Sequence, residues 1–451
     1  MKDKIGYTLG DLGCCCTEQF RAMYLAIFYT LVLKVNPVHV GILMLITKLW
    51  DAINDPLIGA LVDSHQNKGK GKFIPWIKFF AFPTAVLCIL GFVNVSNFAY
   101  GARIAYMFIT YVVYEIMYTC VSVPFGSLSS VMTDDVNQRT DLSRFRSLGG
   151  TIFMTVIVIA GPLFLYKDNQ PVPSHFLIMA AICAVVGLIC LMFTSHWCKE
   201  RIITEPVAKE KEKLNYLDVL KAISKNKALL GVMLSSFIGI VGAGMVNGLN
   251  TYLFRDYFGN VAIMAVSGML SVIWSLIAFI GTKFVAKKFG KKEWIMYSAT
   301  FSVVVYAILF FFPLENPMLF IIINGICYLG VSGFQVLVWA LVNDAIDYQE
   351  LQTGKRNEGI VYSAYTFFRK LANAVSGSMS SFALAIAGFQ VNEAVQNEAF
   401  SGHLWKTYTG LYVVGYLLAV LVLKFIYPLT KEKTAEMLQD LADKRNAATA
   451  E

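Results

Sequence analysis

Two carboxylates lie inside a long apolar stretch of the chain. Asp51 and Asp55 fall within the segment 40–62, which is long enough to cross a bilayer as a helix. Their spacing places them on one helical face, which Asn54 flanks. Anions at that depth are expelled, neutralised or paired. Since small hard cations prefer oxygen ligands, we expect Asp51 and Asp55 to ligate a coupling cation, which is Na⁺, Li⁺ or a proton.

Other apolar segments also contain polar side chains. Glu18 and Arg21 are three residues apart in the segment 5–34, so they are expected either to pair or to face a substrate. Lys370 is expected either to contact substrate or to act as the counter-ion of Asp51 and Asp55. The remaining polar residues of this kind are Glu115, Thr119, Ser122, Gln335, Thr366 and Arg369. Their alternative roles are structural: the hydroxyls bond their own backbone, and Arg369 turns to the cytoplasmic surface.

The composition is that of a polytopic membrane protein. Of 451 residues, 57% are hydrophobic and only 15% are charged, and the mean hydropathy is +0.58. The net charge of +8 does not indicate nucleic acid, because the basic residues are distributed over every second loop instead of forming one patch. This alternation predicts an inner (plasma) membrane protein with both termini in the cytoplasm.

Hydropathy predicts about twelve spans, and therefore an all-α membrane protein. They fall near 5–34, 37–63, 73–96, 100–126, 142–166, 174–198, 228–256, 260–287, 293–313, 316–343, 358–390 and 403–429. The charged stretch between the sixth and seventh spans divides them into two sets of six. We expect an N-terminal bundle with the cation site, a cytoplasmic linker, a C-terminal bundle and a cytoplasmic tail, over 1–198, 199–227, 228–429 and 430–451.

Several classes of protein are disfavoured. No HExxH or GxSxG motif is present, and the five histidines fall in loops or at span ends, so we expect neither an enzyme nor catalytic residues. The nine cysteines lack metal-ligand spacing, and we expect no cofactor besides the coupling cation. A channel is disfavoured because two related halves lack a repeated pore loop.

The stretch Trp50-Asp51-Ala52-Ile53-Asn54-Asp55-Pro56 resembles the helix-II signature of the glycoside–pentoside–hexuronide:cation symporters, which include the melibiose permease. Further motifs agree in order over nearly the whole chain: Lys4-Ile5-Gly6-Tyr7, Gly10-Asp11, Gly71-Lys72-Phe73-Ile74-Pro75-Trp76, Val123-Pro124-Phe125-Gly126-Ser127-Leu128, Arg144-Phe145, Asp344-Ala345-Ile346-Asp347-Tyr348 and Tyr362-Ser363. The resemblance implies the major facilitator fold and symport of a small-molecule sugar with a monovalent cation across the lipid bilayer.

The resemblance also implies roles for single residues. The cation-site positions are matched by Asp51, Asn54, Asp55 and Thr119. The sugar-site positions are matched by Arg144, Gln335, Thr366 and Lys370. We expect a monomer.

This sequence departs from the melibiose carriers at two sugar-binding aspartates, where it has Cys15 and Ser122. Glu18 lies one turn beyond Cys15, and Arg21 adds a cation that the melibiose pattern lacks. We therefore expect Glu18, Arg21 and Ser122 to contact an acidic sugar such as a uronide or a sulfonated sugar. The alternative substrate is a lipid-like or steroid-like amphiphile.

Overall fold

The computed structural model describes residues 2–64, 71–133, 136–201, 226–353, 358–391, 393 and 396–450. Most of the predicted linker, residues 202–225, lies outside this range. The described chain is helical apart from a two-stranded hairpin, β1 (Tyr166–Lys167) and β2 (Gln170–Pro171). Asp168 and Asn169 turn this hairpin with φ values of 49° and 63°, in the left-handed region that these two residue types tolerate.

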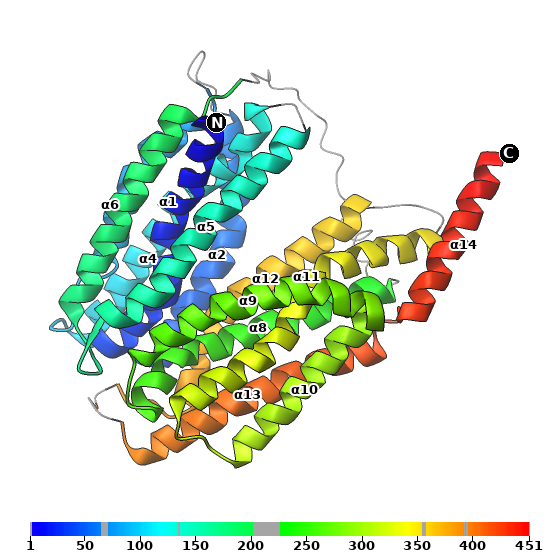
Figure 1. Ribbon diagram of the computed structural model, residues 1–451. Coiled ribbons are helices and arrows are strands. Elements are labelled where there is room, and N and C mark those ends of the chain that lie inside the picture. Colours follow the sequence, from blue (N-terminus) through cyan, green and yellow to red (C-terminus); the bar gives the residue numbers. More distant parts are fainter. Residues whose placement is uncertain are drawn as a thin grey trace. The chain divides into compact units, whose positions relative to one another are not determined.

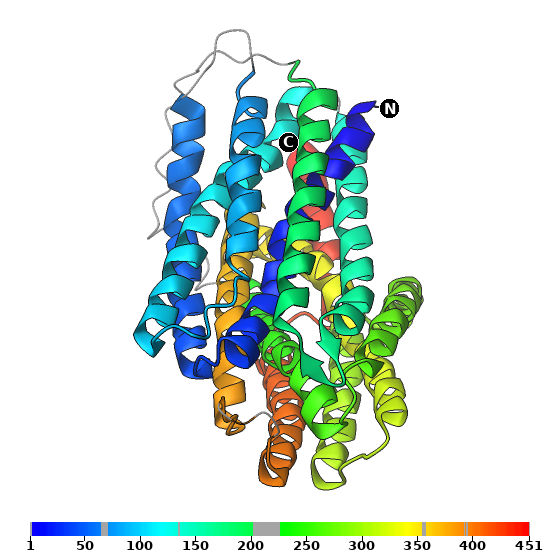
Figure 2. The same ribbon diagram turned by 90° about the vertical axis from the view of Figure 1, so that its left-hand side faces the viewer.

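Each predicted span corresponds to a helix, so the all-α prediction is confirmed (Figures 1 and 2). The helices of the first half are α1 (Lys2–Ile27), continued by the π-helix η1 (Phe28–Val32), α2 (Pro37–Ser64), α3 (Ile74–Leu90), α4 (Tyr100–Met132), α5 (Val136–Phe164) and α6 (Pro173–Trp197). Those of the second half are α8 (Lys227–Tyr252), continued by the π-helix η2 (Leu253–Tyr257), α9 (Ile263–Phe289), α10 (Lys291–Phe311), α11 (Pro317–Thr353), α12 (Glu358–Ile386) and α13 (Glu398–Phe425).

Local sequence explains where several helices begin. Pro37, Pro173 and Pro317 occupy first helical positions, where the missing N–H costs no hydrogen bond. Asn226 and Asn397 cap α8 and α13 by accepting hydrogen bonds from backbone N–H groups three residues later, at 2.9 and 2.8 Å. These signals are local, so sequence alone places most helix starts within a few residues.

Three helical features were not expected. The predicted tail contains α14 (Lys431–Ala450), which packs against α11 through Met437 and Leu441. In addition, α4 and α11 continue to Met132 and Thr353, past the predicted ends of their spans. These additions are too polar for the hydropathy criterion, yet they retain helical hydrogen bonding outside the hydrocarbon core.

The chain forms two compact units. The first comprises Met1–Lys209, Gly259–Gly268 and Phe389–Gln396, and the second comprises the remainder. In the first, α1 packs against α5 and α6, and α3 packs against α4 and α6. In the second, α8 packs against α12 and α13, and α10 packs against α11 and α13. The same pairing therefore occurs twice, as an internal duplication predicts.

By length and composition, seven helices of the described chain could cross a membrane: those at Tyr100–Met132, Asp141–Phe164, Pro173–Trp197, Lys227–Tyr257, Ile263–Phe289, Lys291–Phe311 and Ala399–Phe425. The helices α1, α2 and α12 are not among them, and they carry most of the charged candidate site residues. The cytoplasmic placement of both termini stays a prediction.

Candidate functional site

Two helices of the first unit bring two of the four predicted cation ligands together. Thr119, on α4, donates a hydrogen bond from its hydroxyl to Oδ1 of Asp55, on α2, at 3.2 Å. Asn54 is 4% exposed, and Asp51 is mostly buried one turn before Asp55. Sequence separation does not predict this contact; packing of α4 against α2 creates it.

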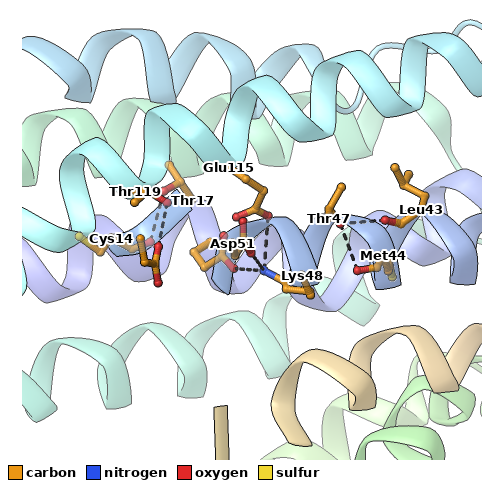
Figure 3. A network of polar contacts seen from close by, with 11 residues as sticks. Cys14, Thr17, Leu43, Met44, Thr47, Lys48, Asp51, Glu115 and Thr119 are labelled. Atoms are coloured by element: carbon orange, nitrogen blue, oxygen red, sulfur yellow. Dashed lines mark hydrogen bonds and ion pairs between the residues drawn. The ribbon is translucent and has the colours of Figure 1, made fainter. Parts of the chain in front are cut away.

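The positive partner of Asp51 is Lys48 of the same helix, a residue to which the sequence analysis assigned no role. Its Nζ lies 3.1 Å from Oδ2 of Asp51, 3.5 Å from Oε1 of Glu115 and 3.6 Å from Oε1 of Glu18. Figure 3 shows Lys48, Asp51 and Glu115 pointing toward one another. The i,i+3 spacing of Lys48 and Asp51 was the available signal.

Two buried polar atoms of α2 have no hydrogen-bond partner among the described residues. They are Oδ1 of Asp51 and Nδ2 of Asn54. An amide side chain can turn about its last bond, so Asn54 can present either its N–H donor or its carbonyl oxygen here. Buried polar groups are normally satisfied, so these two atoms need an explanation. The oxygens available are of the type that a small cation prefers.

The expected pairing of Glu18 with Arg21 does not occur. Glu18 contacts Lys48, and the guanidinium of Arg21 stacks on two aromatic rings of α4. Its Cζ lies 3.3 Å from the ring centroid of Tyr114 and 4.9 Å from that of Tyr111. Of the two alternatives for these residues, pairing is therefore not found, because tyrosines of a neighbouring helix hold the arginine. The alternative, that they face a substrate, stays a prediction.

The Arg21 side chain is 3% exposed, and none of its three nitrogens has a hydrogen-bond partner in the described part of the chain. Aromatic stacking leaves the in-plane N–H donors of a guanidinium free. Such a buried fork is suited to a carboxylate or a sulfonate, which accept two parallel hydrogen bonds.

The other two candidates of the first unit show no comparable convergence. Ser122 is half-buried on α4, and Arg144 is exposed on α5. Nearby, Arg146 donates from Nε to Oδ1 of Asp11 at 2.9 Å, and Lys4 donates to Asp141 at 2.6 Å. These two ion pairs connect α1 with α5. None of these four residues was predicted as a ligand.

The remaining candidates lie in the second unit. Gln335 is exposed on α11, and on α12 Thr366 is half-buried and Lys370 exposed. Arg369 lies over the ring of Trp339, with its Cζ 5.5 Å from the centroid. The role of Lys370 as counter-ion to Asp51 stays a prediction, and Asp51 has Lys48 as a partner within its own unit.

Within the described residues, no group of three or more His, Cys, Asp or Glu side chains could hold a metal ion. The cluster around Lys48 contains carboxylates, but an ammonium occupies its centre. At Asp55 the structure instead brings together one carboxylate and the hydroxyl of Thr119.

Two duplicated six-helix sets with buried charges define a multi-pass membrane transporter of the major facilitator type. Solved structures agree on the fold: a bacterial homologue of the human lysosomal transporter Spinster matches with a TM-score of 0.67 and 12% identity over 97% of both chains. The family of MFS/sugar transport proteins matches residues 6–431, and the chain belongs to that family. Its members are transporters and not enzymes.

Curated relatives match along nearly the whole chain. The uncharacterized symporter YjmB of Bacillus subtilis is 32% identical and covers 98% of this chain and 96% of its own length. A putative sulfoquinovose importer of Escherichia coli is 27% identical, over 100% of this chain and 95% of its own. The glucuronide carrier protein homolog of Escherichia coli is 24% identical, and the match covers 98% of this chain and 95% of that protein.

Proposed function

We propose that this protein is a secondary active symporter that moves a glycoside or sugar acid into the cell with a monovalent cation. The observation that carries the proposal is a group of polar side chains on α2 and α4. Thr119 donates to Asp55, and on the same helix as Asp55 the buried Oδ1 of Asp51 and Nδ2 of Asn54 have no hydrogen-bond partner among the described residues. A structural role alone does not account for buried groups that lack partners.

The coupling ion binds at Asp51, Asn54, Asp55 and Thr119. Asp55 and Thr119 provide a carboxylate and a hydroxyl already in contact, and Asn54 can add a carbonyl oxygen. Na⁺ and Li⁺ use such ligands directly, and a proton would bind one of the two carboxylates. The transport cycle is alternating access, in which each ligand improves the affinity for the other.

The substrate is a sugar acid because Arg21 offers a buried guanidinium with free donors. The names of two relatives, a glucuronide carrier homolog and a putative sulfoquinovose importer, refer to a carboxylated and a sulfonated sugar. This similarity supports an anionic substrate here. With Arg21, the proposed substrate contacts are Ser122, Arg144, Gln335, Thr366 and Lys370, whereas the Glu18 carboxylate, predicted as a further contact, lies 3.6 Å from the ammonium of Lys48. The protein is proposed to act as a monomer.

The test is uptake into sealed vesicles. Radiolabelled methyl glucuronide, sulfoquinovose, a neutral glycoside and a lysolipid are offered with and without an imposed Na⁺, Li⁺ or proton gradient. We expect uphill accumulation of an acidic sugar with one of the gradients. Asp55→Cys should abolish this accumulation and spare exchange across a vesicle without a gradient. Accumulation of the lysolipid instead of any sugar, or uphill uptake that survives Asp55→Cys, would refute the proposal.

A further inference from the structure

One lysine of the first unit is shared by three carboxylates from three helices. Lys48 of α2 contacts Asp51 of α2, Glu18 of α1 and Glu115 of α4, with N···O distances of 3.1, 3.6 and 3.5 Å. Glu115 is 3% exposed. One ammonium cannot pair closely with three carboxylates at once, so the position of the lysine decides which of them it neutralises.

The lysine and the proposed ion site share one carboxylate. Lys48, Asp51 and Asp55 follow at intervals of three and four residues, so they lie along one face of α2. Oδ2 of Asp51 contacts Lys48, whereas its Oδ1 has no partner among the residues that the structure describes. Asp51 therefore lies between an internal cation on one side and Asp55 with Thr119 on the other.

A cation bound at Asp51 and Asp55 would compete with the ammonium. Two positive charges next to one carboxylate repel each other in a site of low dielectric constant. Lys48 already lies within 3.6 Å of two other carboxylates, so its ammonium can move from Asp51 to Glu18 and Glu115 without leaving an ion pair. Lysine suits this movement because its long stem bears a compact charge with three rotatable donors.

The two receiving carboxylates lie next to the proposed anion site. Glu18 is one turn before Arg21 on α1, and Glu115 directly follows Tyr114, on whose ring the Arg21 guanidinium stacks at 3.3 Å. While Asp51 shares the ammonium, Glu18 and Glu115 are paired with it only at 3.6 and 3.5 Å, and their remaining charge repels an acidic sugar at Arg21. When the ammonium leaves Asp51 and pairs more closely with them, this repulsion falls.

We propose that Lys48 is a positioning residue that couples ion binding to sugar binding: the ion displaces its ammonium from Asp51 toward Glu18 and Glu115, which opens the Arg21 site to an anionic sugar. This inference rests on the proposed function, because it needs both a coupling ion and an acidic substrate. To that function it adds a role for Lys48 and the direction in which its ammonium moves. By reciprocity, the sugar also favours ion binding through the same lysine.

The test measures the affinity of purified carrier for methyl glucuronide with and without the coupling cation, by calorimetry. In the wild type we expect a ratio of the two Kd values of about 5 to 150. Lys48→Met should reduce this ratio to roughly 2 or less, and it should tighten binding of the cation alone because the competitor is gone. Lys48→Arg should retain part of the ratio. The control is Lys78→Met, an exposed lysine of α3, which should keep the wild-type ratio.

A second variant tests the role of the Glu18 and Glu115 carboxylates without changing the lysine. In the double variant Glu18→Gln, Glu115→Gln, the repelling charges are absent, so the sugar affinity without cation should rise to about the wild-type value with cation. The same variant should bind the cation more weakly, since Lys48 now has only Asp51. These two opposite shifts would not follow from a merely structural role.

The outcomes separate the two proposals. If the wild type shows no dependence of sugar affinity on any cation, the proposed function fails. If the wild type shows the dependence and Lys48→Met keeps it undiminished, or the double glutamate variant still requires the cation, the lysine mechanism is overturned while the proposed symport stands.

Discussion

Replacing the buried arginine of α1 gives the sharpest prediction about substrate class. Arg21→Met removes the guanidinium and keeps an unbranched apolar chain that can lie against the rings of Tyr114 and Tyr111. Three nitrogens with no hydrogen-bond partner among the described residues are lost with it. If these donors bind the acidic group of the sugar, affinity must fall. If they bind nothing, affinity should not change.

The size of the effect follows from the free donors. A hydrogen bond to a charged group contributes about 1.5–3 kcal/mol. Since about 1.4 kcal/mol corresponds to a tenfold change in Kd, Arg21→Met should weaken methyl glucuronide binding by roughly 10- to 150-fold. A neutral glycoside lacks the acidic group, so its Kd should change by about twofold or less. Arg21→Lys should fall between, because an ammonium cannot provide the planar fork.

Thermal stability distinguishes a substrate contact from a structural one. The substitution removes a desolvated stack worth about 2 kcal/mol. It also removes buried donors, each of which costs about 1–3 kcal/mol when unsatisfied. Because removal of the unsatisfied donors at least offsets the loss of the stack, we expect no fall in the melting temperature of the substrate-free carrier. Calorimetric titration and a thermal melt together decide whether Arg21 contacts substrate or has only a structural role. Unchanged glucuronide affinity in Arg21→Met would refute the assignment of an anionic substrate.

Three further substitutions have defined outcomes. Thr119→Val removes the hydroxyl that contacts Asp55 and should raise the half-saturating cation concentration about 3- to 10-fold, and an unchanged value would contradict its role as a ligand. Glu200→Gln leaves one oxygen for the three backbone N–H groups at the start of α3, now bonded at 2.6, 2.8 and 2.8 Å, and should cost about 1–2 kcal/mol in denaturant melts. Gly149→Ala would place a Cβ 2.7 Å from the backbone nitrogen of Leu12 and should destabilise by about 1–3 kcal/mol, whereas Gly126→Ala, with no atom within 4 Å of its Cβ, should not.

The expected and observed site differ where side chains from several helices meet. The sequence predicted Asp51 and Asp55 as a special pair because two anions in an apolar helix need a partner. It did not predict that Lys48 is that partner for Asp51, or that Glu18 and Glu115 share the lysine. Glu115 lies 67 residues from Lys48 in sequence, and no periodicity relates residues at that separation.

The pairing of Glu18 with Arg21 also shows that spacing along one helix does not predict contacts with other helices. The i,i+3 spacing correctly indicates that the two side chains can meet on α1. The tyrosines of α4 offer the guanidinium a surface at 3.3 Å, and Lys48 offers Glu18 a cation at 3.6 Å. Spacing along the helix identifies one possible partner for each side chain. The packing of neighbouring helices brings other partners, which in this structure are the ones that Glu18 and Arg21 contact.

The sequence by itself determined the twelve spans and their duplication, although it did not predict α14. This follows because hydrocarbon requires each spanning segment to satisfy its own backbone hydrogen bonds, so hydropathy and loop chemistry, which are local, suffice. The tertiary structure decided which charges meet: Lys48 with three carboxylates, Arg21 with two tyrosines and Thr119 with Asp55. Electrostatic energy depends on distances between side chains, and only the packing of α1, α2 and α4 sets those distances.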